Sequence, residues 1–172
     1  TFCAFKTQLV EFVNYLRTRG SGLDSITIVK DGYIVLDEYF GGFRKGEKHN
    51  IYSCTKSVVS TLFAIAQEKG NIGGLDTKLV DMFSGFKFKN LDEWKQQITL
   101  EDLLTMRAGF DARDSYLYDW EGLREMLDAT DTFQYILDLP MSEEPGTRFE
   151  YTNGVSHLIS HIVSISTGVK TN

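Results

Sequence analysis

Two periods of apolar residues divide the chain into a helical start, a β-hairpin and a long, mostly helical remainder. Apolar side chains recur every three to four residues over 2–19, which predicts an amphipathic helix ending at Gly20. Two β-rich runs, 25–30 and 33–40, flank Asp31-Gly32, which predicts a hairpin with a two-residue type I′ turn. The predicted apolar stripe of the helix is Phe2, Phe5, Leu9, Phe12, Val13 and Leu16.

Both faces of the predicted hairpin carry apolar residues, which implies a sheet covered on both sides. Two strands alone do not make a stable sheet, so further strands are expected, although no comparable strand pattern follows in the chain. The alternation along the strands groups Ile26, Ile28, Ile34, Leu36 and Phe40 on one face, and Val29, Tyr33, Val35 and Tyr39 on the other.

The clearest helical pattern after the hairpin begins at Ser57 and ends at Gly70, a residue type that favours the position after a helix. Thr99 and Asp131 are predicted to be the N-caps of two of the later helices. The later helices are predicted at 75–83, 99–106, 123–129, 132–139 and 154–167. The predicted apolar face of the 57–70 helix is Val58, Leu62, Ile65 and Ala66, widened by Val59 and Phe63.

Composition and charge narrow the class of protein. A chain of 172 residues with 42% apolar residues is typical of one folded globular domain. A net charge of −6 argues against nucleic acid and anionic membrane surfaces as partners, and no apolar run is long enough to span a bilayer. We see no signal peptide, so no compartment is predicted. Cys3 and Cys54 form no disulfide framework and are expected to be buried small apolar residues.

Ser53 and Lys56 are the first candidates for chemistry. They are three residues apart at the start of the 57–70 helix, so both side chains lie on one side of its first turn. A serine hydroxyl is a poor nucleophile until a base takes its proton, and Lys56 is placed to take it. Free backbone N–H groups at a helix start could also bind a developing oxyanion. The alternative is that Ser53 is an ordinary helix N-cap.

Other patterns carry weaker signals. The S-x-x-K spacing occurs by chance roughly once in a chain this long, and a second copy lies at 84–87. Cys54 is a weaker candidate nucleophile beside Ser53, because its side chain points about 100° around the helix, toward a different face. His157 and His161 have i, i+4 spacing that could bind a metal, although a solvated polar face explains them as well. The aromatic, acidic loop 111–120 is either surface cover or the wall of a substrate site.

Three stretches in order resemble one known family: Ser53–Lys56 with the helix that follows, residues 98–110 (ITLEDLLTMRAGF) and residues 144–154 (EPGTRFEYTNG). Together they resemble the serine β-lactamase and penicillin-binding-protein superfamily, in particular its class C-like branch, which includes penicillin-recognising esterases. The resemblance covers nearly the whole chain. It implies an α+β fold of the β-lactamase/transpeptidase type, whose antiparallel sheet is represented by the N-terminal hairpin beside a mostly helical remainder. Residues 1–172 are then expected to be the N-terminal portion of a single such domain.

The resemblance also implies roles for four residues. Ser53 and Lys56 correspond to the nucleophile and general base of the family's S-x-x-K element. Tyr151 and Asn153 correspond to its Y-x-N element, in which the tyrosine shares the proton transfer and the asparagine binds the substrate amide and the lysine. Without the resemblance, Tyr151 would be a packing residue and Asn153 the N-cap of the last helix. No metal or cofactor is implied.

The chain departs from the family pattern in two places. Residues 106–109 read Met-Arg-Ala-Gly where the family usually has His-Thr-Ser-Gly. The family's third element, K-T-G or H-x-G, lies on a late strand that binds the substrate carboxylate. Residues 170–172, Lys-Thr-Asn, look like it but come too early and lack the glycine, so we interpret them as coincidental.

The resemblance implies a serine hydrolase that forms an acyl-enzyme with an ester or amide, such as a β-lactam, a D-Ala peptide or a small ester. Relatives are often exported. The expected partner is therefore a small-molecule or peptide substrate. The alternative is a catalytically incomplete module that self-associates or needs a partner to complete its sheet. An open sheet edge invites pairing with another chain, so a homodimer through the hairpin is also expected under this alternative.

Overall fold

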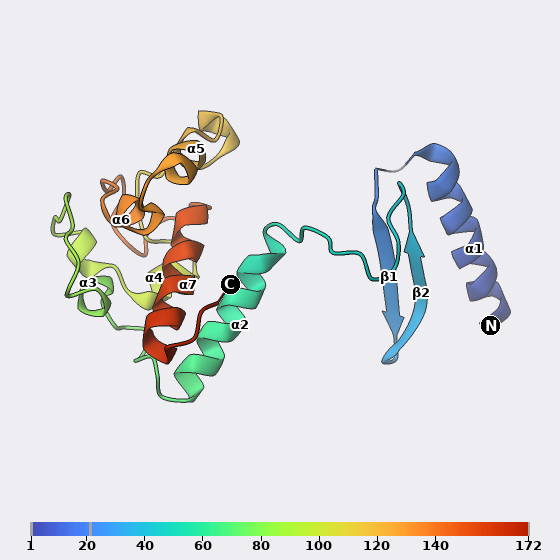
Figure 1. Ribbon diagram of the computed structural model, residues 1–172, viewed down its shortest axis with the longest axis horizontal. Helices are drawn as coiled ribbons and strands as arrows, with labels where there is room; N and C mark the ends of the chain where they lie inside the picture. Colours follow the sequence, from blue (N-terminus) through green and yellow to red (C-terminus); the bar gives the residue numbers. More distant parts are fainter. Residues whose placement is uncertain (1, 21, 172) are drawn as a thin grey trace. The chain divides into compact units, whose positions relative to one another are not determined.

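The computed structural model describes residues 2–20 and 22–171, with side chains from residue 5 onward except at 116. Two compact units are present, Thr1–Asn50 and Ile51–Asn172, and each is described by itself (Figure 1). The first contains a helix and a hairpin, and the second is helical, so the α+β class predicted from the sequence is confirmed. Within the described residues, no helix combines the length and apolar character that a membrane span requires.

The N-terminal unit contains helix α1 (Phe2–Arg19) and an antiparallel hairpin of β1 (Ser25–Lys30) and β2 (Tyr33–Tyr39). The predicted helix and hairpin are both confirmed. The two turn residues have positive φ angles, 51° at Asp31 and 80° at Gly32, as a type I′ turn requires. An Asp-Gly pair accepts these angles at low cost, so this turn is a local property of the sequence.

The strand register corrects the predicted faces of the hairpin. Ile28 pairs with Leu36, but Val29 pairs with Ile34, so Val35 is an extra residue in a β-bulge. The bulge moves Ile34 to the face of Val29, and both side chains are exposed there, at 63% and 60%. Within the N-terminal unit, this side of the hairpin is therefore uncovered, and the predicted two-sided cover is not seen there.

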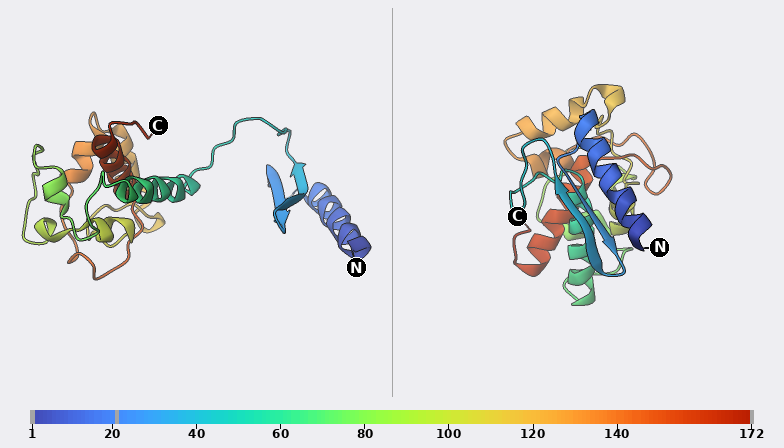
Figure 2. Two further views of the ribbon diagram at one scale, coloured as in Figure 1. Left: turned by 90° about the horizontal axis from the view of Figure 1, so that it is seen from below. Right: turned by 90° about the vertical axis from the view of Figure 1, so that its right-hand side faces the viewer.

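Helix α1 lies alongside the hairpin in both views (Figures 1 and 2). Arg17 of α1 forms an ion pair of 2.6 Å with Glu38 of β2, and Val13 and Leu16 of the predicted stripe are buried. Phe12 of the same stripe is 39% exposed. The side chains of residues 2–4, which include Phe2 and Cys3 of the sequence predictions, lie outside the described part.

The C-terminal unit is built around two long helices that lie side by side, α2 (Cys54–Glu68) and α7 (Asn153–Thr167), as Figures 1 and 2 show. Helices α4, α5 and α6 contact α7, and their apolar residues form one continuous core with those of α2 and α7. The remaining elements are α3 (Leu79–Met82), η1 (Lys95–Gln97), α4 (Leu100–Leu104), η2 (Tyr116–Tyr118), α5 (Glu121–Asp128) and α6 (Thr132–Leu137).

The two predicted N-caps of the later helices are confirmed. The Thr99 hydroxyl accepts from the Asp102 N–H at 3.2 Å, and the Asp102 carboxylate accepts from the Thr99 N–H at 2.9 Å, which completes a capping box. The Asp131 carboxylate accepts from the Gln134 N–H at 2.9 Å at the start of α6. These caps satisfy backbone donors that the first helical turn leaves unpaired.

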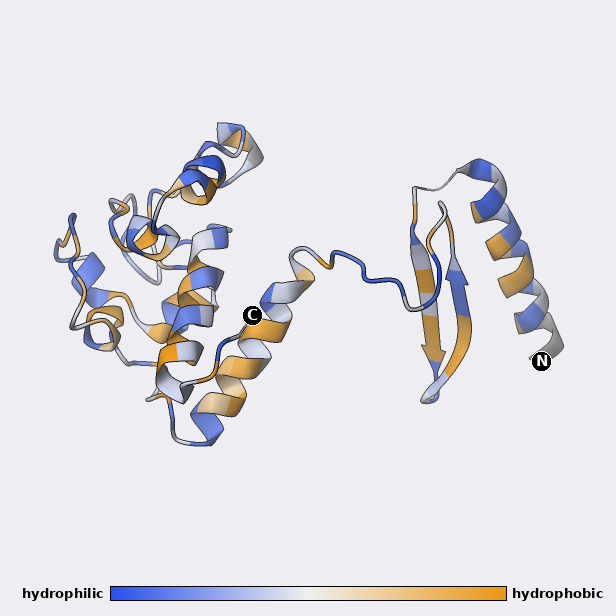
Figure 3. Ribbon diagram, viewed as in Figure 1, coloured by the Kyte–Doolittle hydropathy of each residue, from blue (hydrophilic) through white to orange (hydrophobic). Residues whose placement is uncertain are grey.

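The buried face of α2 differs from the predicted one. Val59, Phe63 and Ala66 are buried, whereas Val58 is 50% and Ile65 is 43% exposed. The three buried residues are spaced i, i+4, i+7 and so form the stripe that meets α7. In Figure 3, hydrophobic colouring covers much of this helix. The pattern of the sequence identified a helix that is apolar over a wide arc, but packing alone selects which part is covered.

The second and third stretches of the family resemblance run beside each other. The Glu150 N–H donates to the Met106 carbonyl at 2.8 Å, and the Gly146 N–H donates to the Arg107 carbonyl at 2.9 Å. Gly109 has φ of 81°, and a Cβ on it would lie 2.3 Å from a carbonyl oxygen of the neighbouring segment. The close approach of these two segments therefore needs glycine there, and it positions the Tyr151 region against the end of α4.

Candidate active site

Ser53 lies directly before α2 and is exposed. The residue before it, Tyr52, has φ of 43°, a left-handed backbone conformation that residues other than glycine rarely adopt. Ser53 is the N-cap residue of α2, but its side chain makes no capping hydrogen bond. The hydroxyl therefore does not cap the backbone of its own helix, in contrast to the alternative that the spacing left open.

The Ser53 hydroxyl contacts two of the residues that the sequence singled out. Its Oγ lies 2.7 Å from the Tyr151 hydroxyl, and the Lys56 ammonium donates to it at 3.3 Å. The Lys56 Nζ also lies 4.9 Å from the centroid of the Tyr151 ring. Tertiary structure thus brings the segment before α7 to the start of α2, across 98 positions of sequence.

Asn153 completes this cluster from the first turn of α7. Its side-chain Oδ1 accepts a hydrogen bond of 2.6 Å from Lys56 Nζ. The N-cap of α7 is Thr152, so the helix begins one residue before the predicted start and Asn153 is not its cap. The four residues predicted from the sequence and the resemblance are therefore connected, because Lys56 contacts Ser53, Tyr151 and Asn153, and Ser53 also contacts Tyr151.

The electrostatics of the cluster favour proton exchange with Tyr151. Partial burial alone would raise the pKa of the Tyr151 phenol. The Lys56 ammonium and the Ser53 hydroxyl outweigh that effect because both stabilise the phenolate, so the pKa of Tyr151 lies below its usual value. A tyrosine with a lowered pKa, within hydrogen-bond distance of a serine hydroxyl, can accept and return a proton.

Asp114 is a member of the cluster that the sequence did not reveal. It lies in the aromatic, acidic loop 111–120 and is 4% exposed. Its carboxylate accepts from the Asn153 backbone N–H at 2.5 Å and from the Asn153 side-chain Nδ2 at 2.9 Å. Burial raises the pKa of Asp114, although both hydrogen bonds and the Lys56 charge oppose the increase. No periodicity or motif in the sequence marks this position.

The loop that carries Asp114 thus reaches the site through a carboxylate rather than through its aromatic side chains. Tyr118 and Trp120 are exposed, at 47% and 40%, as expected for surface cover. The side chain of Tyr116 lies outside the described part.

The weaker candidates lie elsewhere or in other surroundings. Cys54 is exposed, which corrects the expectation that it is buried. The ring of His161 stacks on Phe133 with centroids 4.0 Å apart, so this histidine packs in an aromatic cluster rather than on a solvated face. Among residues 2–20 and 22–171, no group of three or more His, Cys, Asp or Glu side chains could hold a metal ion. The second S-x-x-K copy at 84–87 lies in the segment after α3.

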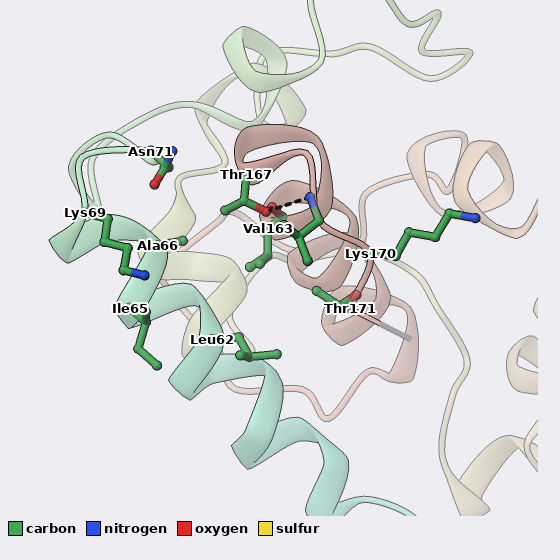
Figure 4. Close-up of a pocket in the computed structure, with 10 residues that line it drawn as sticks. Leu62, Ile65, Ala66, Lys69, Asn71, Val163, Thr167, Lys170 and Thr171 are labelled. Carbon is green, nitrogen blue, oxygen red and sulfur yellow. Dashed lines mark hydrogen bonds between the residues drawn. The ribbon is translucent and has the colours of Figure 1, made fainter.

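A groove of about 360 Å³ lies between the C-terminal half of α2 and the end of α7 (Figure 4). Leu62, Ile65 and Val163 give it an apolar floor, and Lys170 and Thr171 belong to its wall. None of the four candidate residues lines it. The Lys170-Thr171 pair, which looked like the third family element, is therefore part of this groove and does not contact Ser53.

Comparison with known proteins gives one family. The Beta-lactamase family model matches residues 14–171. A search of curated proteins finds no match.

Among solved structures, the chain is similar to a penicillin-binding protein homologue from Pyrococcus abyssi, an octamer, with a TM-score of 0.69 and 23% identity over 95% of this chain and 40% of that one. It is also similar to a protein assigned as a beta-lactamase from Bacteroides dorei, with a TM-score of 0.69 and 19% identity over 95% of this chain and 47% of that one. A third similar structure, assigned as a 6-aminohexanoate-dimer hydrolase from Bacillus anthracis, has a TM-score of 0.64 and 18% identity over 85% of this chain and 40% of that one. The chain spans less than half the length of these structures.

Proposed function

Because the chain belongs to the Beta-lactamase family, we propose that it acts as a serine hydrolase whose nucleophile is Ser53. In this proposal, residues 1–172 are the N-terminal portion of a single β-lactamase-like domain. The observation that carries the proposal is the contact of one exposed serine hydroxyl with both a tyrosine hydroxyl, at 2.7 Å, and a lysine ammonium, at 3.3 Å. An ordinary exposed serine can satisfy its hydroxyl with water and does not require contact with both a tyrosine and a lysine.

The proposed reaction begins with attack of Ser53 Oγ on the carbonyl carbon of an ester or amide. In the reactive form Tyr151 is a phenolate beside the Lys56 ammonium, and the hydroxyl proton passes to that phenolate as the Oγ–C bond forms. The pair then gives a proton to the leaving alcohol or amine as its bond to the carbonyl carbon breaks. The Ser53 N–H, at the start of α2, supplies half of the oxyanion hole. Water afterwards hydrolyses the acyl-serine ester and restores the free hydroxyl.

Asn153 has two roles in the proposal. Its Oδ1 accepts from Lys56 at 2.6 Å and so keeps the ammonium beside the serine. Its position at the edge of the cluster also suits contact with the amide of a bound substrate. The substrate classes that fit are a β-lactam, a D-Ala peptide and a small ester, since each presents a carbonyl to the same nucleophile.

The test is the intact mass of the protein before and after treatment with a fluorophosphonate probe, a penicillin and p-nitrophenyl acetate. We expect one covalent adduct on the wild-type chain and none on Ser53→Ala. Ser84→Ala is the matched control, because Ser84 belongs to the second S-x-x-K copy and its loss should leave labelling unchanged. Tyr151→Phe should reduce the labelling rate by at least about tenfold, because general acid–base groups typically contribute that much or more. Equal labelling of Ser53→Ala and wild type would refute the proposal.

A second candidate function follows from the unpaired edges of the hairpin and its exposed apolar face. Each strand pairs only with the other among the described residues, and Val29 and Ile34 are exposed on that face. The hairpin could therefore pair with a second copy of the chain, as a catalytically incomplete module would require. Sedimentation velocity over a range of concentrations tests this candidate. A monomer at every concentration would count against it, and a dimer without fluorophosphonate labelling would favour it over the hydrolase.

A further inference from the structure

We propose that Asp114 is a positioning residue that sets which end of the Asn153 side-chain amide faces Lys56. This inference rests on the proposed function, because it assigns a task to a group behind the reacting atoms. Asp114 contacts neither Ser53 nor Lys56 directly. The Gly154 N–H adds a weaker interaction with its carboxylate, and its two hydrogen bonds of 2.9 Å or shorter both come from Asn153. One of them holds the backbone at the start of α7, and the other holds the side-chain nitrogen.

The chemistry of the three groups allows only one arrangement. An ionised carboxylate accepts hydrogen bonds but donates none, and a lysine ammonium donates but accepts none. The Asn153 amide lies between them and has one end of each kind. Its Nδ2 donates to Asp114 at 2.9 Å, which leaves its Oδ1 to accept from Lys56 at 2.6 Å. A rotation of the amide by 180° would place donor against donor at Lys56 and acceptor against acceptor at Asp114.

The burial of Asp114 suggests that its carboxylate has a function, because a neutral side chain would be less costly to bury. Its carboxylate is 4% exposed and forms no ion pair within the described residues. Burial of a carboxylate without a direct cationic partner is unfavourable, and burial accordingly raises the pKa of this group. A neutral asparagine would fill the same space at lower desolvation cost. A carboxylate differs from it by accepting from both Asn153 donors at once.

Asp114→Asn therefore isolates the proposed role with little change of shape. The new side chain has one acceptor oxygen and one donor nitrogen, so it cannot accept from both the Asn153 N–H and the Asn153 Nδ2. If it keeps the backbone N–H, its own nitrogen faces the Asn153 amide and favours the rotated orientation. Lys56 then loses its acceptor and is no longer held beside Ser53. We expect the rate of Ser53 acylation to fall about tenfold or more, because catalysis is sensitive to small displacements of the reacting groups.

A second substitution makes the test independent of a general loss of structure. Asn153→Asp alone places two carboxylates face to face. Combined with Asp114→Asn, it restores the donor and acceptor pattern: Asn at 114 accepts from the backbone N–H and donates to the carboxylate at 153, which accepts from Lys56. The effect of Asp114→Asn on the melting temperature should therefore be more favourable in the Asn153→Asp background than in the wild type, by at least about 3 °C. A residue that only fills space would have the same effect in both backgrounds.

The experiment measures fluorophosphonate labelling rates and melting temperatures for wild type, both single variants and the double variant. Asp138→Asn is the matched control. This carboxylate, at the end of α6, also accepts hydrogen bonds, from the Lys89 N–H at 3.1 Å and the Gln134 side chain at 2.8 Å, and it lies outside the candidate site. Its labelling rate should equal that of the wild type.

The two arms separate failure of this inference from failure of the proposed function. If wild type labels and Asp114→Asn labels within about twofold of it, Asp114 does not position the site. If Asp114→Asn changes the melting temperature equally in both backgrounds, the orientation argument is wrong. If wild type does not label at all, the hydrolase proposal fails, but unequal shifts in melting temperature still support the orientation of the amide and equal shifts still overturn it.

Discussion

Lys95 tests how much a buried ammonium contributes to the stability of the C-terminal unit. This lysine is 0% exposed, and its ammonium donates to the carbonyls of Leu137, at 3.0 Å, and Leu139. Leu137 is the last residue of α6 and Leu139 lies two residues beyond it, a region where a helix end leaves carbonyl groups unpaired. The Nζ also lies 5.8 Å from the ring centroid of Phe110, and burial lowers the pKa of the lysine.

Lys95→Met removes the ammonium and retains most of the apolar stem. Two buried carbonyls then lose their partner, at about 1–3 kcal/mol each. The variant no longer buries an ammonium, which offsets part of that loss. We therefore expect the free energy of unfolding to fall by about 2–4 kcal/mol, and the urea midpoint to fall by about 1–2 M if the slope is about 2 kcal/mol/M.

Urea unfolding followed by far-UV circular dichroism measures this change. Lys78→Met is the control, because the Lys78 ammonium donates to the Gln97 carbonyl at 2.9 Å in a position that water can reach. Its loss should cost about 1 kcal/mol or less. If Lys95→Met costs no more than Lys78→Met, the two buried carbonyls do not depend on Lys95 and the reasoning is wrong.

Two further predictions concern the C-terminal unit. Gly109→Ala should lower the free energy of unfolding by about 2–4 kcal/mol, because alanine is strained at φ of 81° and its Cβ would meet a carbonyl oxygen at 2.3 Å; the same urea titration measures it, with Gly85→Ala, where a Cβ meets nothing within 4 Å, as the control. A loss no larger than the control's would contradict the close approach of the two segments. His161, whose pKa burial lowers from the usual 6.5, binds its proton more weakly in the folded than in the unfolded chain. Its contribution to stability is therefore present above pH 6.5 and is lost as the pH falls from 6.5 through the folded pKa. Melting temperatures between about pH 5 and 8 should fall less steeply toward acid for His161→Phe than for wild type; parallel curves would show that this histidine is not responsible.

Much of the local structure could be predicted because its causes lie within a few residues. The Asp31-Gly32 turn needs two positive φ angles, and this dipeptide accepts both. The Thr99 and Asp131 caps depend on a side chain and an N–H three residues apart. For the same reason the Ser53–Lys56 pair could be predicted from helix geometry alone, since residues three apart share one side of the first turn.

The predicted faces of the hairpin and of α2 were wrong where exposure depends on register or on the element packed against them. The bulge at Val35 reversed the face of Ile34, because one extra residue changes the alternation of every side chain beyond it. The exposed Val58 and Ile65 have the same apolar character as the buried Val59, and only the position of α7 distinguishes them. Hydrophobicity alone could not make these choices.

The longer helices, the hairpin and the four candidate residues could be predicted from the residues alone, the last through three stretches that resemble one family. That Tyr151 and Asn153 lie against the Ser53–Lys56 pair, and that Asp114 contacts Asn153, follows only from how the chain folds. A hydrogen bond across 98 residues has no periodicity to reveal it, because it depends on the packing of α7 against α2 and not on neighbours along the chain. Asp114 could not be predicted from the sequence, because its place in the site follows from the fold of a loop whose residues follow no repeating pattern.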